Sequence, residues 1–478
     1  MYLGLDLGTS GLKGLLIGAD QTVLAEATAA LTVERPHPGW SEQRPDDWIA
    51  AAEAVFDALA AQADLGGLRG IGLSGQMHGA TVLGADDRPL RPCILWNDTR
   101  AHAQAAAMDA DPRWRQITGN IVFPGFTAPK LAWMRDEEPD LFTKARRVLL
   151  PKDYLRLWLT GEAVGEMSDA AGTSWLDTGA RDWSADLLAE TGLTTDAMPH
   201  LVEGAAVSGT LRGDLARRWG LPECVVAGGA GDNAASAIGA GVVRPGEAFV
   251  SLGTSGVLFA ATEGYSPDPG TAVHTFCHAL PDTWHQMGVI LAATDALNWF
   301  ARVAGAEPQT LTADLGALQA PGQALFLPYL GGERTPHNDA AVRGAFLGLE
   351  HVADRAAMTR AVLEGVAFAF ADCRDALAAT GTQLEHVLGL GGGSRSDYWL
   401  RAIATLLGVP IDVPVAGDFG GAFGAARLGM MADTGAGTAI ATRPPIARSV
   451  DPHPGLADAF TAGHARYKDA YDRIQGVT

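Results

Sequence analysis

The sequence predicts two α/β domains of like topology, each opening with a β-hairpin. The pentapeptide LGTSG occurs twice, from Leu7 and again from Leu252, each time between two short apolar runs of strand type. Units of strand, turn and helix follow each copy. A chain of 478 residues is also too long for one ordinary hydrophobic core. An internal duplication explains the matched contexts better than two unrelated hairpin turns do.

The first half reads as three strands, a helix and a further strand. Apolar residues recur at helical spacing after Asp46, and this spacing predicts a helix from about that residue. The predicted strands are a hairpin over 2–17, a third strand near Thr22–Thr32, and strand ends at "RGIGLSG" (69–75) and "CILWND" (93–98).

The second half repeats this order from about Glu247, again with a hairpin first. The predicted elements after the hairpin are a strand over 285–290, a helix over 293–304, a long amphipathic helix over 354–379 and a strand, Gly-rich turn and helix over 386–408. We therefore expect an N-terminal domain over 1–243, a C-terminal domain over 244–478 and a cleft between them.

Composition and charge exclude several classes of protein. The formal net charge is −20, which argues against a nucleic-acid partner or an anionic membrane, because both need a basic surface. We expect no transmembrane helix and no signal peptide, since no apolar run approaches about 18 residues and Asp6 interrupts the first one. The four scattered cysteines favour reduced thiols and a cytoplasmic protein. Whether the chain forms a homodimer is left open.

The two hairpin turns are candidate anion sites. Gly permits a tight turn, Thr and Ser add hydroxyl groups, and successive N–H groups form a concave nest for an anion. Each hairpin would then hold one side of a nucleotide's phosphates. Asp is unfavourable inside a strand, so Asp6 beside the first turn suggests a Mg²⁺ ligand acting through waters, with a solvated or capping Asp as the alternative. Lys13, one of only five lysines, is a candidate phosphate contact, with a solvated edge charge as the alternative.

Asp232 follows a strand-like stretch and opens a run of small residues that suggests a closely packed helix. It is a candidate catalytic carboxylate, although an Asp there could simply cap the helix. The spacing Gly229-x-Gly231-x-x-Ala234 imitates a dinucleotide-binding fingerprint, but no acidic residue closes a second strand about 20 residues on.

Three further stretches carry candidate binding residues. Met77 and His78 follow a predicted strand end, where α/β proteins bind ligands, and a structural histidine is the alternative. "HTFCH" (274–278) suggests zinc, but neighbouring strand residues face opposite ways and a fourth ligand is missing. "GLGGGS" (389–394) offers backbone N–H groups and space for a nucleotide.

Several of these motifs resemble one family across nearly the whole chain. The chain is similar to the carbohydrate kinases that include the glycerol, gluconate, ribulose and xylulose kinases. These kinases have the actin-like, ribonuclease-H-like ATPase fold. The motifs are "GLDLGTSGLK" (4–13), "FTAPKLAWMRDEEP" (126–139), "GAGDNAASAIGAG" (229–241), "GAFLGLEHVADRAAMTRAVLEG" (344–365) and "GLGGGSRSDYWLR" (389–401).

The resemblance implies a kinase that uses ATP and Mg²⁺ to phosphorylate a small sugar. It makes Asp232 the general base and Asn233, with Met77 and His78, a sugar contact. "GLSGQMHG" (72–79), "GWSEQ" (39–43) and "HTFCHALPDTWHQMG" (274–288) are most similar to members that act on D-xylulose. The implied Mg²⁺ residue is Asp6, and the implied ATP contacts are Gly8, Thr9, Ser10, Lys13, Gly253, Thr254, Gly391, Gly392 and Ser394. A related ketose or polyol is the alternative substrate, and a sensor without turnover is the alternative function.

Overall fold

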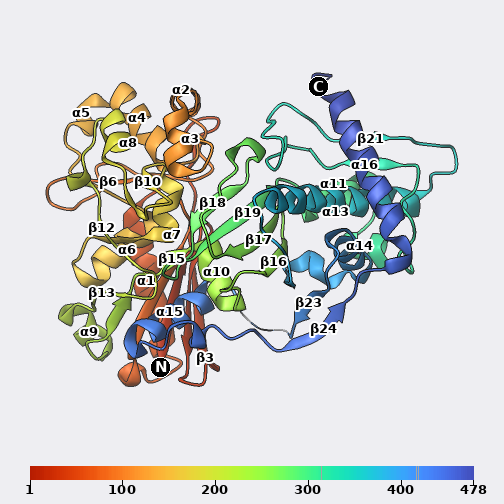
Figure 1. Cartoon of the computed structure of the whole chain (residues 1–478). Helices are drawn as coiled ribbons and strands as arrows, with labels where there is room; N and C mark the ends of the chain where they lie inside the picture. Colours follow the sequence, from red (N-terminus) through yellow and green to blue (C-terminus); the bar gives the residue numbers. More distant parts are fainter. Residues whose placement is uncertain (314, 416, 418, 478) are drawn as a thin grey trace. The chain divides into compact units, whose positions relative to one another are not determined.

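The computed structural model describes residues 1–313, 315–415, 417 and 419–477 (Figure 1). The chain forms two compact units. The first comprises Met1–Val243, Phe276–Trp284 and Asp418–Arg443, and the second comprises Arg244–Thr275, His285–Gly417 and Pro444–Thr478. The chain first passes between the units where the sequence predicts a boundary, at 243/244. Two stretches of the predicted C-terminal domain group with the first unit instead, and the expected cleft stays a prediction.

The first unit is built on a mixed sheet in the order β13-β14-β5-β1-β2-β3, with β15 beside β5. β1 and β2 form the predicted hairpin, and β1 runs parallel to β5. The strands of this sheet are β1 Tyr2–Leu7, β2 Gly11–Ile17, β3 Val23–Ala30, β5 Gly70–Gly75, β13 Val207–Thr210, β14 Val225–Ala227 and β15 Ala230–Gly231.

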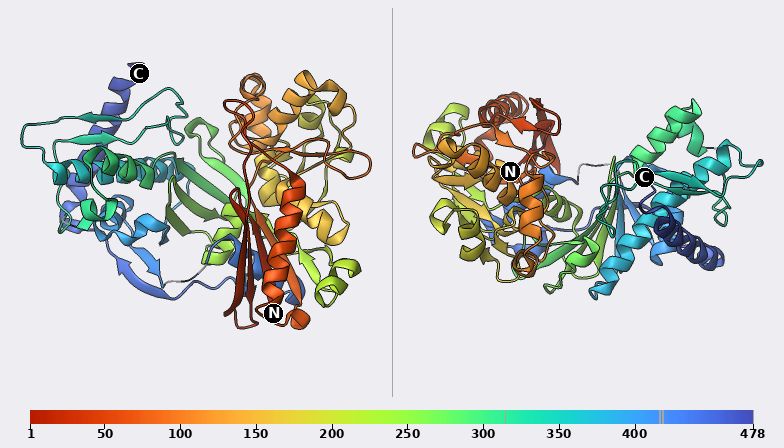
Figure 2. Two further views of the ribbon diagram at one scale, coloured as in Figure 1. Left: turned by 180° about the vertical axis from the view of Figure 1, so that it is seen from behind. Right: turned by 90° about the horizontal axis from the view of Figure 1, so that it is seen from above.

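Alternate residues of β1 face two different cores. Leu3, Leu5 and Leu7 face the core that includes α1 (Pro45–Ala60), seen as the orange helix along the near side of the dark red strands in Figure 2, left. On the other face, a Cβ on Gly4 would lie 1.8 Å from the carbonyl oxygen of Ala422 in α15 (Gly421–Thr434). Glycine therefore lets α15 lie directly on the sheet, which is why this late segment joins the first unit.

The remaining elements of the first unit flank the sheet or form a smaller layer beside it. The helices are α2 His102–Asp109, α3 Pro112–Thr118, α4 Thr127–Glu137, α5 Pro139–Phe142, α6 Pro151–Thr160, α7 Met167–Ala170, α8 Ala185–Glu190, α9 Gly213–Trp219 and α10 Asp232–Ala240. The short strands are β4 Glu42–Gln43, β6 Thr81–Leu83, β7 Cys93–Ile94, β8 Arg147–Leu149, β9 Val164–Glu166, β10 Leu176–Asp177, β11 Asp182–Trp183 and β12 His200–Val202.

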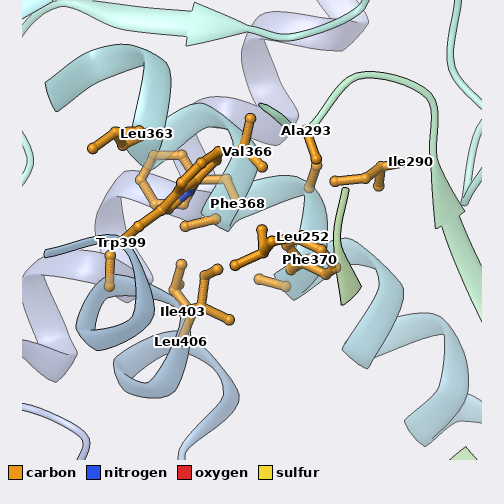
Figure 3. Close-up of a cluster of buried hydrophobic side chains, with 14 of the residues drawn as sticks. Leu252, Ile290, Ala293, Leu363, Val366, Phe368, Phe370, Trp399, Ile403 and Leu406 are labelled. Carbon is orange, nitrogen blue, oxygen red and sulfur yellow. The ribbon is translucent and has the colours of Figure 1, made fainter. Parts of the chain in front are cut away.

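A second mixed sheet, in the order β18-β19-β17-β16-β22-β23-β24, lies mainly in the second unit. Figure 3 shows part of the core of this unit, where Leu252 and Phe370 lie near Trp399 and Ile403. The elements of this sheet and of the second unit are β16 Glu247–Leu252, β17 Gly256–Thr262, β18 His274–Cys277, β19 Trp284–Ile290, β20 Leu325–Leu327, β21 Ala345–Leu347, β22 His386–Leu390, β23 Ile411–Pro414, β24 Ile446–Val450, α11 Thr294–Ala304, α12 Pro308–Ala313, α13 Arg355–Ala379, α14 Asp397–Leu407 and α16 Ala457–Ile474.

The prediction of two α/β domains with like beginnings is confirmed. Most predicted elements are present, but the strand predicted over 93–98 is limited to Cys93–Ile94, because the chain turns directly afterwards. All four cysteines are buried free thiols. Within the described residues, no helix combines the length and the apolar character needed to span a membrane.

Candidate functional site

The ends of β1 and β5 bring Asp6 beside polar partners. Asp6 pairs with Lys13 across the antiparallel β1–β2 ladder and with Ser74 across the parallel β1–β5 ladder. The Ser74 hydroxyl donates a hydrogen bond of 2.8 Å to Asp6 Oδ1. Lys13 Nζ lies 3.1 Å from Glu26 Oε2 at the partly exposed edge of the sheet. Asp6 and Lys13 therefore lie on one face of the hairpin, and the phosphate role of Lys13 stays a prediction.

The N-terminus of α15 points at Asp6. A Cβ on Gly421, the first residue of α15, would lie 2.8 Å from both Asp6 Oδ2 and Ser74 Oγ. The positive end of a helix dipole favours a carboxylate there. No group of three potential metal-ligating side chains occurs in the described part of the chain. Mg²⁺ usually takes one or two carboxylates plus waters and phosphate oxygens, so Asp6 fits this ion.

Asp232 is the first residue of α10 and directly follows the cap residue, Gly231. Its Oδ1 accepts hydrogen bonds from the Asn233 backbone N–H at 2.7 Å and from Asn233 Nδ2 at 3.0 Å. Burial, and then the nearby Asp6 carboxylate, raise the pKa of Asp232 to about 6. Asp232 thus satisfies one free N–H of the first helical turn, as the capping alternative expects. Its raised pKa is also typical of a functional carboxyl group.

Met77 lies against the segment that carries Asp232, and the next residue, His78, packs against Gly172 and Phe126. A Cβ on Gly231 would lie 2.9 Å from Met77 Sδ, so the absence of a side chain at Gly231 leaves space for the Met77 thioether. His78 Nδ1 is 2.6 Å from the Gly172 carbonyl oxygen, and the ring stacks on Phe126 with centroids 4.4 Å apart. Gly231 is the second glycine of the spacing that imitates a dinucleotide-binding fingerprint. Its close packing against Met77 explains why glycine stands there, and no bound dinucleotide is needed.

The first hairpin turn is held by a polar network that sequence reasoning missed. Thr9 donates to Gln76 Oε1 at 3.0 Å and accepts at 3.0 Å from the indole N–H of Trp96, whose side chain is 49% exposed. Gln43 Nε2 donates 2.7 Å to the Thr9 carbonyl oxygen. Gln43 and Gln76 end the motifs "GWSEQ" and "GLSGQ". A glutamine at the end of each motif was the signal available in the sequence.

The second hairpin turn contacts the Gly-rich turn of its own unit. Gly391 has a left-handed backbone (φ 83°), and a Cβ there would lie 2.7 Å from the Leu252 carbonyl oxygen. Gly392 has nothing within 4 Å of such a Cβ. Ser394 is buried, and its hydroxyl donates back to the Gly391 carbonyl oxygen at 2.7 Å. Open backbone at Gly392, beside the turn that carries Gly253 and Thr254, could receive a nucleotide.

Each unit thus collects its own set of predicted site residues. In the second unit, Gly253, Thr254, Gly391, Gly392 and Ser394 belong to two neighbouring turns. His274 and Cys277 lie in β18, and the described residues around them form no three-residue metal cluster. The first unit holds Asp6, Gly8, Thr9, Ser10, Lys13, Met77, His78, Asp232 and Asn233 at the carboxyl ends of β1, β5 and β15 and in the first hairpin.

Relatives of known name match along almost the whole chain. A xylulose kinase of Escherichia coli is 48% identical over 435 residues, which cover 90% of each chain. One of Bacillus subtilis is 37% identical over 438 residues, covering 89% of this chain and 87% of the relative. A solved xylulose kinase structure from Brucella ovis has a TM-score of 0.99 at 60% identity, with both chains fully covered.

Two domain models of one family also match. A structure of Plasmodium falciparum glycerol kinase with ADP shares the fold alone, with a TM-score of 0.89 at 17% identity. The N-terminal domain model of the FGGY family of carbohydrate kinases matches residues 1–239, and the C-terminal domain model matches residues 248–432. The chain therefore belongs to the FGGY family of carbohydrate kinases.

Proposed function

We propose that the protein transfers the γ-phosphoryl group of ATP to D-xylulose and forms D-xylulose 5-phosphate and ADP. The observation that carries this proposal is the packing of Met77, which precedes His78, against Gly231 next to Asp232, with Asp6 close enough to raise the pKa of Asp232. Xylulose kinases of 48% and 37% identity supply the choice of sugar.

In the proposed reaction, a sugar hydroxyl oxygen attacks the γ-phosphorus of ATP. The bond from that phosphorus to the β,γ-bridging oxygen breaks, ADP leaves with that oxygen, and the hydroxyl proton passes to an Asp232 carboxylate oxygen. With a pKa of about 6, Asp232 is largely ionised at neutral pH and can accept this proton. Asn233, Met77 and His78 hold the sugar, while the two hairpins and the Gly391–Gly392 turn hold the nucleotide.

Asp6 would hold Mg²⁺, which supplies charge neutralisation of the phosphate oxygens when it is bound. The Ser74 hydroxyl and the N-terminus of α15 orient the carboxylate for that task. The proposal therefore divides the first unit into a metal-binding residue, Asp6, and a proton acceptor, Asp232. Both are carboxylates, and their surroundings set them apart.

A coupled ADP-release assay over a panel of sugars tests the substrate. D-xylulose should give the highest kcat/KM among D-xylulose, D-ribulose, L-ribulose, gluconate and glycerol. A higher value for another sugar would make the protein a kinase for that ketose or polyol. No ADP release with any sugar would favour the sensor without turnover. His78→Ala should lower kcat/KM for D-xylulose by about 5- to 150-fold, which corresponds to roughly 1–3 kcal/mol, because buried sugar hydroxyls lose a partner.

A further inference from the structure

His78 has a backbone conformation that ordinary residues adopt rarely. Its φ is 69°, in the left-handed region, although it carries a bulky side chain. Such a conformation persists only where neighbouring groups enforce it. It begins three residues after β5 ends at Gly75, in the segment that turns Met77 toward Gly231. The groups that hold this backbone therefore also set the orientation of His78, the proposed sugar contact.

Two side chains of α4 hold the carbonyl group of His78. Lys130 Nζ donates to its oxygen at 2.8 Å, and Thr127 Oγ1 donates to the same oxygen at 3.1 Å. Thr127 and Lys130 are fully buried and lie one helical turn apart. Because both donors meet one oxygen, they fix the orientation of the peptide group that follows His78.

Burying the charged ammonium group of Lys130 at this position is energetically unfavourable. Burial lowers the pKa of its ammonium group to about 7, since a charge inside the protein loses its hydration. Within the described residues, the hydrogen bond of Lys130 Nζ goes to the His78 carbonyl oxygen. Thr127 alone would satisfy that oxygen, and an apolar side chain would fill the same space at lower cost. We therefore explain the buried lysine by its hydrogen bond to the His78 carbonyl oxygen, which fixes the orientation of that peptide group.

The same helix also fixes the ring of His78. Phe126, the residue that precedes α4, stacks on the imidazole at an interplanar angle of 13°. A Cβ on Gly172 would lie 2.5 Å from the ring atoms Cε1 and Nδ1. The Gly172 carbonyl oxygen can only accept, so Nδ1 donates to it at 2.6 Å. A neutral His78 then carries its lone pair on Nε2, the atom suited to accept from a sugar hydroxyl.

We propose that Lys130 is a positioning residue that sets sugar affinity through His78. Lys130 holds the left-handed backbone, and Phe126 and Gly172 hold the ring, so Nε2 meets the sugar in one orientation. This inference rests on the proposed function, in which His78 binds the sugar. Without Lys130, the backbone of His78 relaxes toward ordinary angles, and the sugar loses a preorganised partner.

Lys130→Met in the full-length protein tests this inference. The KM for D-xylulose should rise about tenfold, because the sugar then meets a His78 that is no longer held in its binding orientation. The KM for ATP should stay within about twofold, because Lys130 acts through the sugar contact alone. The thermal midpoint should stay level or rise, since a buried ammonium is removed. Lys144→Met, at an exposed lysine of the same unit, is the matched control and should change none of these values.

A double-mutant cycle separates positioning from a general structural role. In a His78→Ala background, Lys130→Met should have no further effect on the sugar KM, because the ring that it positions is gone. A full tenfold effect in that background would overturn the inference, and so would an unchanged sugar KM for Lys130→Met alone. If His78→Ala is itself silent with every sugar, the sugar contact of the proposed function fails as well.

Thr127→Val provides an independent variant that keeps the side-chain volume. It removes the second donor to the His78 carbonyl oxygen and leaves Lys130 in place. The sugar KM should rise by about two- to fivefold, and this rise should also vanish in the His78→Ala background. If Lys130→Met does not fold, an unchanged sugar KM for Thr127→Val overturns the inference.

Discussion

The two LGTSG hairpins have the same five residues but different strand pairing. In the first, Leu7 pairs with Leu12, so the turn runs over residues 8–11. In the second, Leu252 pairs with Gly256, so the turn runs over residues 253–255. If the second hairpin had the strand register of the first, Leu252 would pair with Val257. Identical local sequence therefore does not determine the geometry of the turn.

The neighbours of each turn explain the difference. In the first hairpin, Gly11 also pairs with Ala30 of β3, and Gln43 holds the Thr9 carbonyl oxygen. In the second hairpin, the carbonyl oxygens of Gly253 and Thr254 accept from backbone N–H groups at the start of α11, at 2.9 and 2.9 Å. Tertiary hydrogen bonds thus select between two turns that the pentapeptide alone permits.

The two hairpins also differ in charge. Asp6 and Lys13 pair in the first, whereas the corresponding residues of the second are Ser251 and Leu258. The Asp6 carboxylate of the first hairpin lies near Asp232. The comparison suggests a division in which the first unit supplies charged chemistry and the second offers backbone groups to a nucleotide.

The strongest test of this division is Asp232→Asn. Asn keeps the size and much of the hydrogen bonding of Asp232 but removes the basic oxygen. Because general base catalysis is worth about 10²–10⁴ in rate, kcat should fall by at least about 100-fold. Steady-state kinetics should show an ATP KM near wild type, and a thermal melt should show intact folding. Retention of more than about a tenth of wild-type kcat would instead support the capping role.

Local patterns predicted much of the fold. The hairpins, the long helix α13 and the strand, turn and helix over 386–408 all follow from apolar periodicity and glycine at turns. The register difference between the hairpins was beyond such patterns. So was the grouping of α15 with the first unit, because the small residues of α15 acquire meaning only against Gly4 and Gly72.

The sequence singled out the charged residues of the candidate site but not the side chains that contact the first hairpin turn. Asp6 stands out because Asp is unfavourable inside a strand, and Asp232 stands out because it opens a run of small residues. The partners of Thr9, namely Gln43, Gln76 and Trp96, are far apart in the sequence and meet only in the fold. Neutral side chains of this kind look like ordinary polar residues until their contacts are known.

Asp6→Asn tests whether the first hairpin, and not the second, carries the Mg²⁺ ligand. The variant should need more Mg²⁺ for half-maximal rate and lose at least about tenfold in kcat, because a neutral amide holds Mg²⁺ poorly. Ser251→Ala, at the corresponding residue of the second hairpin, is the matched control and should stay within about twofold. Titration of Mg²⁺ at saturating ATP and sugar measures both. Equal losses in the two variants would remove the proposed asymmetry.

The pH profile should report the environment of Asp232. The base must be ionised, so kcat should rise with pH through about 6 and then level off, with about a tenth of the maximum one pH unit below. Asp6→Asn should move this midpoint to lower pH, because the Asp6 charge helps to raise the pKa. A midpoint that stays in place in Asp6→Asn would show that burial alone raises it.

The raised pKa of Asp232 should also make the free energy of unfolding depend on pH. The folded state raises the pKa of Asp232 from 3.8 to about 6, so it binds the proton more tightly than the unfolded state does. The stabilisation is complete below about pH 4 and is lost as pH rises through about 6. Asp232→Asn lacks this loss, so its stability relative to wild type should increase between those pH values. Chemical denaturation at pH 4 and pH 7 measures the difference.

The smallest effects are expected where the second hairpin meets the Gly-rich turn. Gly391→Ala puts a Cβ 2.7 Å from the Leu252 carbonyl oxygen, at a φ of 83°. The strain should cost about 1–3 kcal/mol of stability and displace the turn, so the ATP KM should rise by about three- to tenfold. Gly392→Ala meets nothing within 4 Å, so its thermal midpoint should stay at the wild-type value.

The pair of variants separates strain from nucleotide contact. If the nucleotide approaches the open backbone of Gly392, the added methyl group of Gly392→Ala should raise the ATP KM without a change in thermal midpoint. The sugar KM should stay within about twofold in both variants, because the proposed sugar contacts all belong to the first unit. A rise in the sugar KM with an unchanged ATP KM would contradict the assignment of this turn to the nucleotide, and with it the division drawn from the two hairpins.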